Sequence, residues 1–385
     1  MFVELHMLQN FPPSCLNRDD TNAPKDCEFG GYRRARISSQ CLKRSIRQTF
    51  NGQGYLKPDN LATRSRQLIE KKIVPHFVEQ HQDEDTARKA ATAALLSAGF
   101  GVNDGESSYL LFFGQQEIDG LLRTIKENWD QLVKAGDNID NKGDLAKKHI
   151  PSGLPAKLHE QLDGGKAADV GLFGRMLADL PNKNVDAAAQ VAHALSTNRI
   201  SMEMDFYTAV DELQTKEDES GAGAAMMGTI EFNSACFYRY ANIDLDQLTH
   251  NLSGDVELAR QALDAFLRAS IDAIPTGKQT TMAAQNPPSM IFAVARERGL
   301  WSLANAFAKP VHPDREKDLI QKSTEALDDQ WGRMARVYGE HDIEAKAICL
   351  VDDADLKNLS DAKVDSVEAL VDYIKTHAQP TPVEA

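Results

Sequence analysis

The sequence lacks most features of membrane, secreted and metal-binding proteins. No run of about eighteen apolar residues could span a bilayer, so we expect no membrane partner. The first residues contain neither a basic region nor a long apolar stretch, from which we expect a cytoplasmic protein. The five cysteines are odd in number and never occur as CxxC, which favours reduced thiols over a disulfide framework or a zinc site.

The sequence also lacks the short motifs of common enzyme chemistries. It has no G-x-S-x-G, Walker loop, HExxH or GxGxxG pattern, and we therefore predict no cofactor and no catalytic metal. A chain of 385 residues, 42% of them hydrophobic, can nevertheless bury a sizeable core. This length favours two domains, or one domain with a large insertion.

Positive charge is scarce overall and concentrated in one place. The chain has 43 Lys and Arg against 57 Asp and Glu, a balance that argues against a nucleic-acid partner. Residues 30–50, however, contain six Lys or Arg and no acidic residue, which leaves the rest of the chain near -20. One surface can therefore be strongly positive while the remainder is acidic.

The hydrophobic periodicity predicts an α+β fold. Alternating apolar residues predict strands over 2–8, 229–244, 289–296 and 345–351. Amphipathic patterns predict helices over 39–50, 61–81, 85–101, 255–274, 313–340 and 366–378. Strands alternating with helices at both ends of the chain, around a helical middle, indicate an α+β core with a large insertion.

Three further segments are assigned from their composition. Residues 10–38, rich in Pro, Asn, Asp and Gly, predict a long ordered loop with Gly30 and Gly31 in a turn. Residues 184–197 predict a helix capped by Asp186. Residues 201–229 combine aromatic side chains with an acidic, Gly/Ala-rich stretch, and they predict an extended arm that contacts a partner.

The helix expected over 39–50 has two chemically different faces. Apolar residues recur at every fourth position on one face, while Lys43 and Arg47 lie on another. A helix opened by Ser38 or Ser39 presents backbone N–H groups and the positive end of its dipole. A solvated basic face is the ordinary interpretation of such a helix, but six cations without a nearby acid favour a phosphate-binding surface.

Two other groups of residues suggest chemistry less specifically. Asp19 and Asp20, beside the basic stretch, could hold a divalent ion for phosphodiester cleavage, although adjacent Asp residues more often form a turn or a helix cap. Met176, Phe206 and Tyr207 have side chains suited to stacking on unpaired bases, although such residues are also ordinary core.

Three motifs together resemble one known family: "PSCLNRDD", "FGGYRRARISSQCLKRSIR" and "ACFYRYANIDLDQL". They are similar to the backbone subunit of the type I-E Cascade, a CRISPR surveillance complex (the CasC family). The resemblance implies an RRM-like (ferredoxin-like) palm with a large helical fingers insertion and a protruding thumb arm. It implies the first part of the palm, with the basic loop and helix, at 1–59, fingers at 60–180, a palm helix at 181–200, the thumb at 201–228, and the rest of the palm with C-terminal helices at 229–385.

The resemblance also implies a function. It implies a non-catalytic subunit that polymerises along a CRISPR guide RNA, together with further copies of itself and other Cascade subunits, in antiviral defence. Gripping phosphates leaves the base edges free to pair with target DNA. The residues expected to contact RNA, from the matching positions and the neighbouring cations, are Arg18, Lys25, Arg33, Arg34, Arg36, Ser38, Gln40, Lys43, Arg44, Arg47, Met176, Phe206, Tyr207 and Thr208.

One stretch departs from the family, and two alternatives remain. Family members can carry a lysine-rich fingers helix that attracts duplex DNA, but residues 142–157, with Lys142, Lys147 and Lys148, are interrupted by Pro151 and Gly153. The first alternative is a metal-dependent ribonuclease subunit of a type III-like complex. Backbone subunits of type III complexes cut target RNA with an acidic loop residue, and Asp19 and Asp20 occupy an acidic loop here. The second is a generic RRM protein, which the lack of an RNP1-like run disfavours.

Overall fold

The computed structural model describes residues 1–139, 145–210 and 224–382, which form two compact units. The first unit consists of Met1–Tyr55, Gln190–Asn242 and Asp264–Gln379. The second consists of Leu56–Ala189, Ile243–Leu263 and the last residues from Pro380. The segment expected to form the fingers, 60–180, lies within the second unit.

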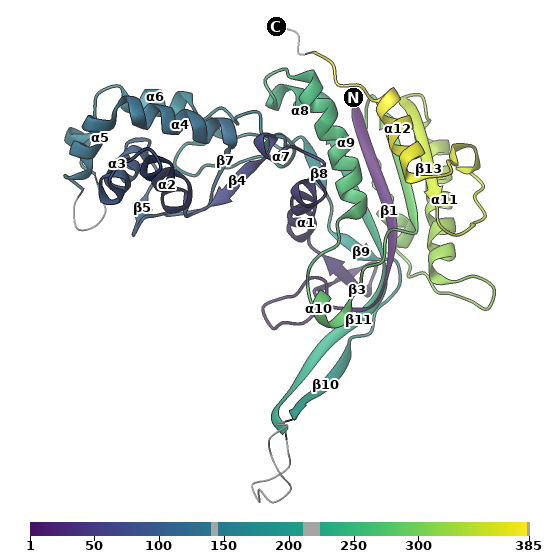
Figure 1. Ribbon diagram of the computed structural model, residues 1–385. Coiled ribbons are helices and arrows are strands. Elements are labelled where there is room, and N and C mark those ends of the chain that lie inside the picture. Colours follow the sequence, from purple (N-terminus) through teal and green to yellow (C-terminus); the bar gives the residue numbers. More distant parts are fainter. Residues whose placement is uncertain (140–144, 211–223, 383–385) are drawn as a thin grey trace, which may run out of the picture. The chain divides into compact units, whose positions relative to one another are not determined.

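The first unit is built on a large sheet with the strand order β13-β12-β1-β11-β9-β3-β2, in which β8 and β10 also pair with β11 (Figure 1). Neighbouring strands pair antiparallel at β13-β12, β12-β1, β11-β9, β9-β3 and β3-β2. The strands are β1 (Phe2–Ser14), β2 (Asp26–Phe29), β3 (Tyr32–Ile37), β8 (Ala189–Val191), β9 (Ala194–Ser196), β10 (Glu203–Val210), β11 (Ala224–Asp244), β12 (Met290–Arg296) and β13 (Ile343–Leu350). The predicted strands and the predicted α+β class are confirmed, while the RRM-like detail stays a prediction.

Helices cover this sheet and close its core. They are α1 (Ser39–Gly52), α10 (Gln279–Met282), α11 (Leu319–Tyr338), α12 (Val367–His377) and the second half of α9 (Val256–Asp272), whose residues up to Leu263 belong to the second unit. The helices predicted at α1, α9, α11 and α12 are confirmed. Helix α11 contacts β1, and α12 contacts β12 and β13. Trp331 of α11 packs edge-on against Phe292 of β12, with ring centroids 4.9 Å apart. One apolar cluster of the first unit thus lies between the sheet and α11.

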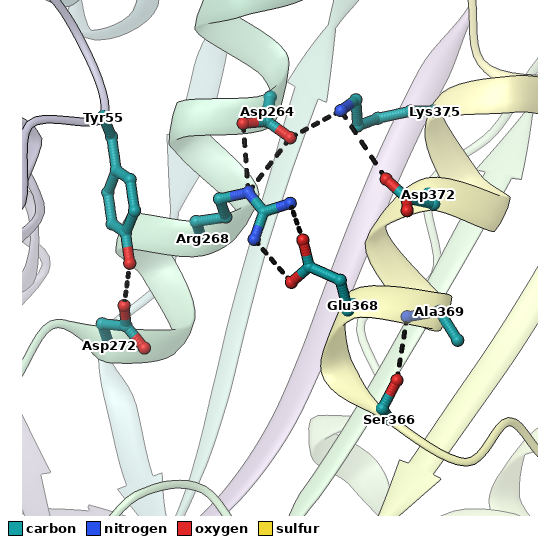
Figure 2. Close-up of polar contacts among 9 residues, drawn as sticks. All are labelled: Tyr55, Asp264, Arg268, Asp272, Ser366, Glu368, Ala369, Asp372 and Lys375. Carbon is teal, nitrogen blue, oxygen red and sulfur yellow. Dashed lines mark hydrogen bonds and ion pairs between the residues drawn. The ribbon is translucent and has the colours of Figure 1, made fainter.

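Figure 2 shows how α12 is held against the end of α9. Arg268 of α9 donates two hydrogen bonds to Glu368 of α12, at 2.8 and 2.7 Å, and also contacts Asp264. Lys375 of α12 reaches the same Asp264 at 2.7 Å. On the neighbouring turn of α9, Asp272 accepts from the hydroxyl of Tyr55, which lies just after α1. These contacts tie the C-terminal helix and the chain after α1 to one helix.

Strand β1 differs from the half-buried strand that its alternation predicts. Its polar residues Glu4 and His6 are fully buried, because both faces of the sheet are covered here. Glu4 accepts from Tyr240 at 2.8 Å and from Arg296 at 3.1 Å, and His6 contacts the Tyr238 hydroxyl at 2.9 Å. Buried polar groups of this kind are tolerated because they have partners.

The second unit is mostly helical around its own apolar core. Its helices are α2 (Val74–Val78), α3 (Glu84–Ser97), α4 (Gln115–Glu127), α5 (Trp129–Gly136), α6 (Leu154–Glu160), α7 (Ala168–Phe173) and α8 (Leu245–Asn251). It also contains two short antiparallel strand pairs: β4 (Ala62–Ser65) pairs with β7 (Leu111–Gly114), and β5 (Val102–Asn103) pairs with β6 (Glu106–Ser107). The helix predicted over 61–81 therefore begins later, because its first residues form β4. Across the described residues of both units, no helix is long and apolar enough to cross a membrane.

The structure corrects two further predictions in the first unit. The palm helix expected over 181–200, including the helix predicted at 184–197, is wrong: β8 and β9 form there instead. The alanines favour a helix locally, but pairing with β11 and β3 decides the conformation. The loop expected over 10–38 is also partly wrong, because it contains the β2-β3 hairpin, whose turn holds Gly30 at φ 63°.

Candidate nucleic-acid interface

Helix α1 begins as the sequence predicts, at a serine cap. The Ser38 side chain accepts a hydrogen bond from the Cys41 N–H at 3.3 Å, and the Ser38 N–H donates to the Asn17 side chain at 2.9 Å. The first turn of α1 carries no acidic residue. Its positive dipole end is therefore not neutralised by a carboxylate of its own first turn.

The two faces of α1 separate as predicted. Leu42, Ile46 and Phe50 are buried and attach the helix to the first unit. Lys43 and Arg47 are half-buried, whereas Gln40 and Arg44 are exposed. Partial burial lowers the pKa of Lys43. The cations of α1 thus stand on a helix that is already fixed by its apolar stripe.

The loop before β2 is shaped by Asp19. One carboxylate oxygen of Asp19 accepts from the Thr21 N–H at 2.9 Å, the Thr21 hydroxyl at 2.8 Å and the Ala23 N–H at 3.0 Å. The hydroxyl bond contributes most to holding the pKa of Asp19 below its usual value. Asp20 is exposed. Within the described residues, no group of three or more His, Cys, Asp or Glu could hold a metal ion.

A hollow of about 420 Å³ separates this loop from α1. Arg18 and Arg44 both line it, together with Asp19 and Asp20. Its wall at Gly277 admits only glycine, because a Cβ there would overlap the backbone carbonyl of Leu16. A smaller hollow, lined by Lys25 and Arg36, shares Leu16 and Asn17 with the first one. The two hollows therefore adjoin.

The arginines of strand β3 have three different environments. Arg33 is exposed and forms an ion pair with Asp26 of β2. Arg34 is 0% exposed, and its guanidinium donates to the carbonyls of residues 196, 197, 307 and 308. Arg36 is half-buried; it donates to the Asp26 carbonyl at 3.2 Å and lies 3.1 Å from His193. Arg34 is therefore not available to a phosphate, contrary to the sequence prediction.

We use the term basic surface for the cations that α1, the loop and β3 present on the first unit. Their common feature is a side chain that is exposed or half-buried and not placed in the core. Arg33 also meets this description but is left out because it is paired with Asp26. The members of the basic surface are Arg18, Lys25, Arg36, Lys43, Arg44 and Arg47.

Strands β10 and β11 extend from the sheet of the first unit as a two-stranded arm (Figure 1). Phe206 lies opposite Thr229, and Thr208 opposite Met227, so alternate residues share one face. On that face Met204, Phe206 and Met227 are all exposed, Phe206 to 62%. We call these three residues the apolar face of the arm. Phe206 is thus not a core residue of the described chain.

Tyr207 and Thr208 complete the predicted arm residues. Tyr207 points to the opposite side of β10 from Phe206 and packs across Gly228, where any Cβ would overlap its ring. Thr208 is exposed beside Met227. Sequence reasoning missed Met204 and Met227; the alternation of Met202, Met204, Phe206 and Thr208 is the signal that could have identified the first of them.

Met176 belongs to the second unit and is 77% exposed. Its neighbours in sequence are both buried. Arg175 donates to both carboxylate oxygens of Glu117, at 2.7 and 2.8 Å, and Leu177 packs in the core. Met176 is therefore held outward by its buried neighbours.

The interrupted lysine stretch also lies in the second unit. Lys147 and Lys148 are in a short 3-10 helix, Lys147–His149, and α6 starts only after Gly153, which has φ 74°. This agrees with the interruption that the sequence predicts. Lys142 lies outside the described residues.

The comparisons with known proteins place this geometry in a wider context. A family described as CT1975-like protein has a sequence model that matches residues 3–376. A chain of a solved "CRISPR RNA-guided surveillance complex, pre-nicking" is 31% identical with a TM-score of 0.84, and 98% of this chain and 99% of that chain are covered. A chain of a "CRISPR RNA-guided surveillance complex" is 27% identical with a TM-score of 0.73, covering 98% and 100%. No curated protein matched the sequence.

Proposed function

We propose that this chain, which belongs to the CT1975-like protein family, is a guide RNA-binding backbone subunit of a CRISPR surveillance complex of the type I-E Cascade class. The basic surface is the observation that carries the proposal, because it gathers six cations around a capped helix start in an otherwise acidic protein. The likeness to chains of surveillance complexes supports it. The motifs quoted from the sequence support the assignment to type I-E.

The chemistry of the basic surface suits RNA phosphates. Lys43, Arg44 and Arg47 stand on a fixed helix, so they can meet a phosphate chain without first being ordered. Cations that contact phosphates carry no base preference. In this proposal the chain holds any guide sequence by its backbone and leaves the bases free to pair with target DNA.

The apolar face of the arm supports assembly of several copies along one RNA. Exposed apolar side chains gathered on one face are typical of surfaces that are covered by a partner. In this proposal the arm of one copy reaches the next copy and wedges Phe206 against a displaced nucleotide. Met176, held outward in the second unit, is the proposed counterpart from the neighbouring copy.

We also propose that the subunit is not a nuclease. One oxygen of the Asp19 carboxylate is engaged by its own loop, because it accepts three hydrogen bonds from Thr21 and Ala23. The alternative, a metal-dependent ribonuclease, needs Asp19 and Asp20 to hold a divalent ion beside the RNA. Incubating the assembled particle with complementary RNA and magnesium tests this. We expect intact RNA; regular cleavage that Asp19→Ala or Asp20→Ala abolishes would establish the alternative.

The central experiment is purification after co-expression with the neighbouring genes. We expect the chain to copurify with other subunits and with RNA of one defined length. The Lys43→Ala, Arg47→Ala double variant should retain less of that RNA while remaining folded. If the unmodified chain purifies without RNA and does not bind single-stranded RNA, the proposed function is wrong.

A further inference from the structure

A histidine that the sequence analysis did not use lies beside the basic surface. His193 is exposed in the turn between β8 and β9, and its Nδ1 lies 3.1 Å from Nη1 of Arg36. A guanidinium can only donate hydrogen bonds, so Nδ1 is the acceptor. The imidazole is therefore neutral here and carries its proton on Nε2.

The surroundings of His193 oppose its protonation. Partial burial, followed by the positive charges of Arg36 and Lys25, lowers the pKa of His193 below 6.5. Arg36 belongs to β3, and Lys25 precedes β2. On β2 the Asp26 carboxylate is already paired with Arg33. The positive charges of Arg36 and Lys25 thus both lower the pKa of the imidazole, and a bound anion would raise that pKa.

Both of these cations belong to the basic surface. We propose that His193 is a further phosphate contact of the basic surface, and that it binds RNA in its protonated form. A phosphate oxygen takes the place of the contact between Arg36 and His193, and both side chains then donate to it. The proton that His193 gains comes from solvent. This inference rests on the proposed function.

Uptake of a proton on binding fixes the direction in which the RNA affinity changes with pH. Free His193 has a pKa below 6.5, and a bound phosphate raises that pKa because it favours the charged imidazole. RNA must therefore bind more tightly as the pH falls through the interval between the two values. The affinity gains up to about tenfold for each unit by which RNA raises the pKa. One more phosphate contact also steepens the salt dependence by about 0.7 at acidic pH.

The experiment measures binding of oligouridine to the full chain over a salt series, at about pH 6 and about pH 8, conditions that bracket a histidine pKa. His193→Gln keeps a polar side chain but cannot gain the proton. His341→Gln is the matched control, because His341 is also exposed in the first unit but contacts Asp342 at 3.2 Å. We expect the chain and the His341→Gln control to bind more tightly and with a steeper salt slope at acidic pH. His193→Gln should lose both differences and keep the slope of the alkaline condition.

The outcomes separate the two proposals. If His193→Gln retains the pH dependence of the unmodified chain, the inference is wrong while the proposed function stands. The same holds if His341→Gln removes the pH dependence. If the unmodified chain shows no salt-dependent RNA binding at either pH, the proposed function itself fails.

Discussion

The basic surface and the apolar face of the arm are built in opposite ways. The cations stand on supports that are packed before any ligand arrives: Leu42, Ile46 and Phe50 bury one side of α1. The arm has no such support at Phe206, where two strands leave the side chain 62% exposed. The first region has its geometry fixed within the subunit, and in the proposed assembly the second gains its burial from a partner.

This difference separates binding from stability. Exposed cations cost the isolated subunit little, because water solvates them and surface ion pairs contribute about 0 to 1 kcal/mol. An exposed Phe gains the burial energy of its ring only on association. Changes in either region should therefore spare the folded subunit, whereas changes to the supports beneath them should not.

The largest effect is expected at Arg34, which belongs to the basic stretch in sequence but to the core in structure. Arg34→Ala removes the donor from four backbone carbonyls, and we expect the free energy of unfolding to fall by about 3 kcal/mol or more. Arg33→Ala is the matched control; its exposed ion pair should contribute less than about 1 kcal/mol. Denaturant titrations measure both, and equal losses would contradict the division between core and surface.

The next effect tests the arm. Phe206→Ala should weaken RNA-bound assembly by roughly 1 to 3 kcal/mol for each base that its ring stacks on. The melting temperature of the RNA-free subunit should barely change. Tyr338→Ala is the control, because that ring is 63% exposed but belongs to α11 and not to the arm strands β10 and β11. A large drop in the melting temperature of the Phe206→Ala subunit would show that Phe206 packs in a core.

A smaller effect is expected from the double variant Lys43→Ala, Arg47→Ala. The apolar stripe of α1 is intact in this variant, so the subunit should fold. The slope of log affinity for RNA against log salt concentration should shrink in magnitude by about 1.4, which is about 0.7 for each phosphate that is no longer neutralised. The affinity for RNA should fall about tenfold. The loss should be equal for two unrelated RNA sequences. Arg333→Ala with Arg336→Ala removes two exposed cations from α11 and should leave the slope unchanged. A loss confined to one RNA would indicate base readout.

Local periodicity predicted much of the fold, and long-range pairing accounts for the errors. The stripe of α1 and the alternation of β11 are properties of short windows, so both could be identified. The alanine-rich stretch before Thr197 could not, because its strands exist only through pairing with β3 and β11. Propensity is a weak guide wherever distant strands compete for a segment.

The same limit applies to the candidate site. The composition of residues 30–50 identifies a basic stretch but cannot separate Arg34 from Arg33, since the carbonyls that bury Arg34 lie more than 160 positions away. Nor could it decide whether Phe206 is core or exposed, because that depends on which strands the arm pairs with. His193 was missed for a related reason: its contact with Arg36 spans 157 positions.

The smallest expected effect concerns Ser38, which was predicted to contact RNA but is only 7% exposed and caps α1. Ser38→Ala should lower the free energy of unfolding by about 1 kcal/mol, and Ser38→Gly by only a few tenths, because glycine tolerates the cap position. If Ser38 serves only as the cap, both variants should keep the RNA affinity and the salt slope of the unmodified chain. If its hydroxyl also donates to a phosphate, both should lose the same affinity, with an unchanged slope because the hydroxyl is neutral. We expect the first pattern, because the low exposure of Ser38 leaves its hydroxyl little access to a phosphate. Denaturant titration and RNA binding of the two variants distinguish these patterns.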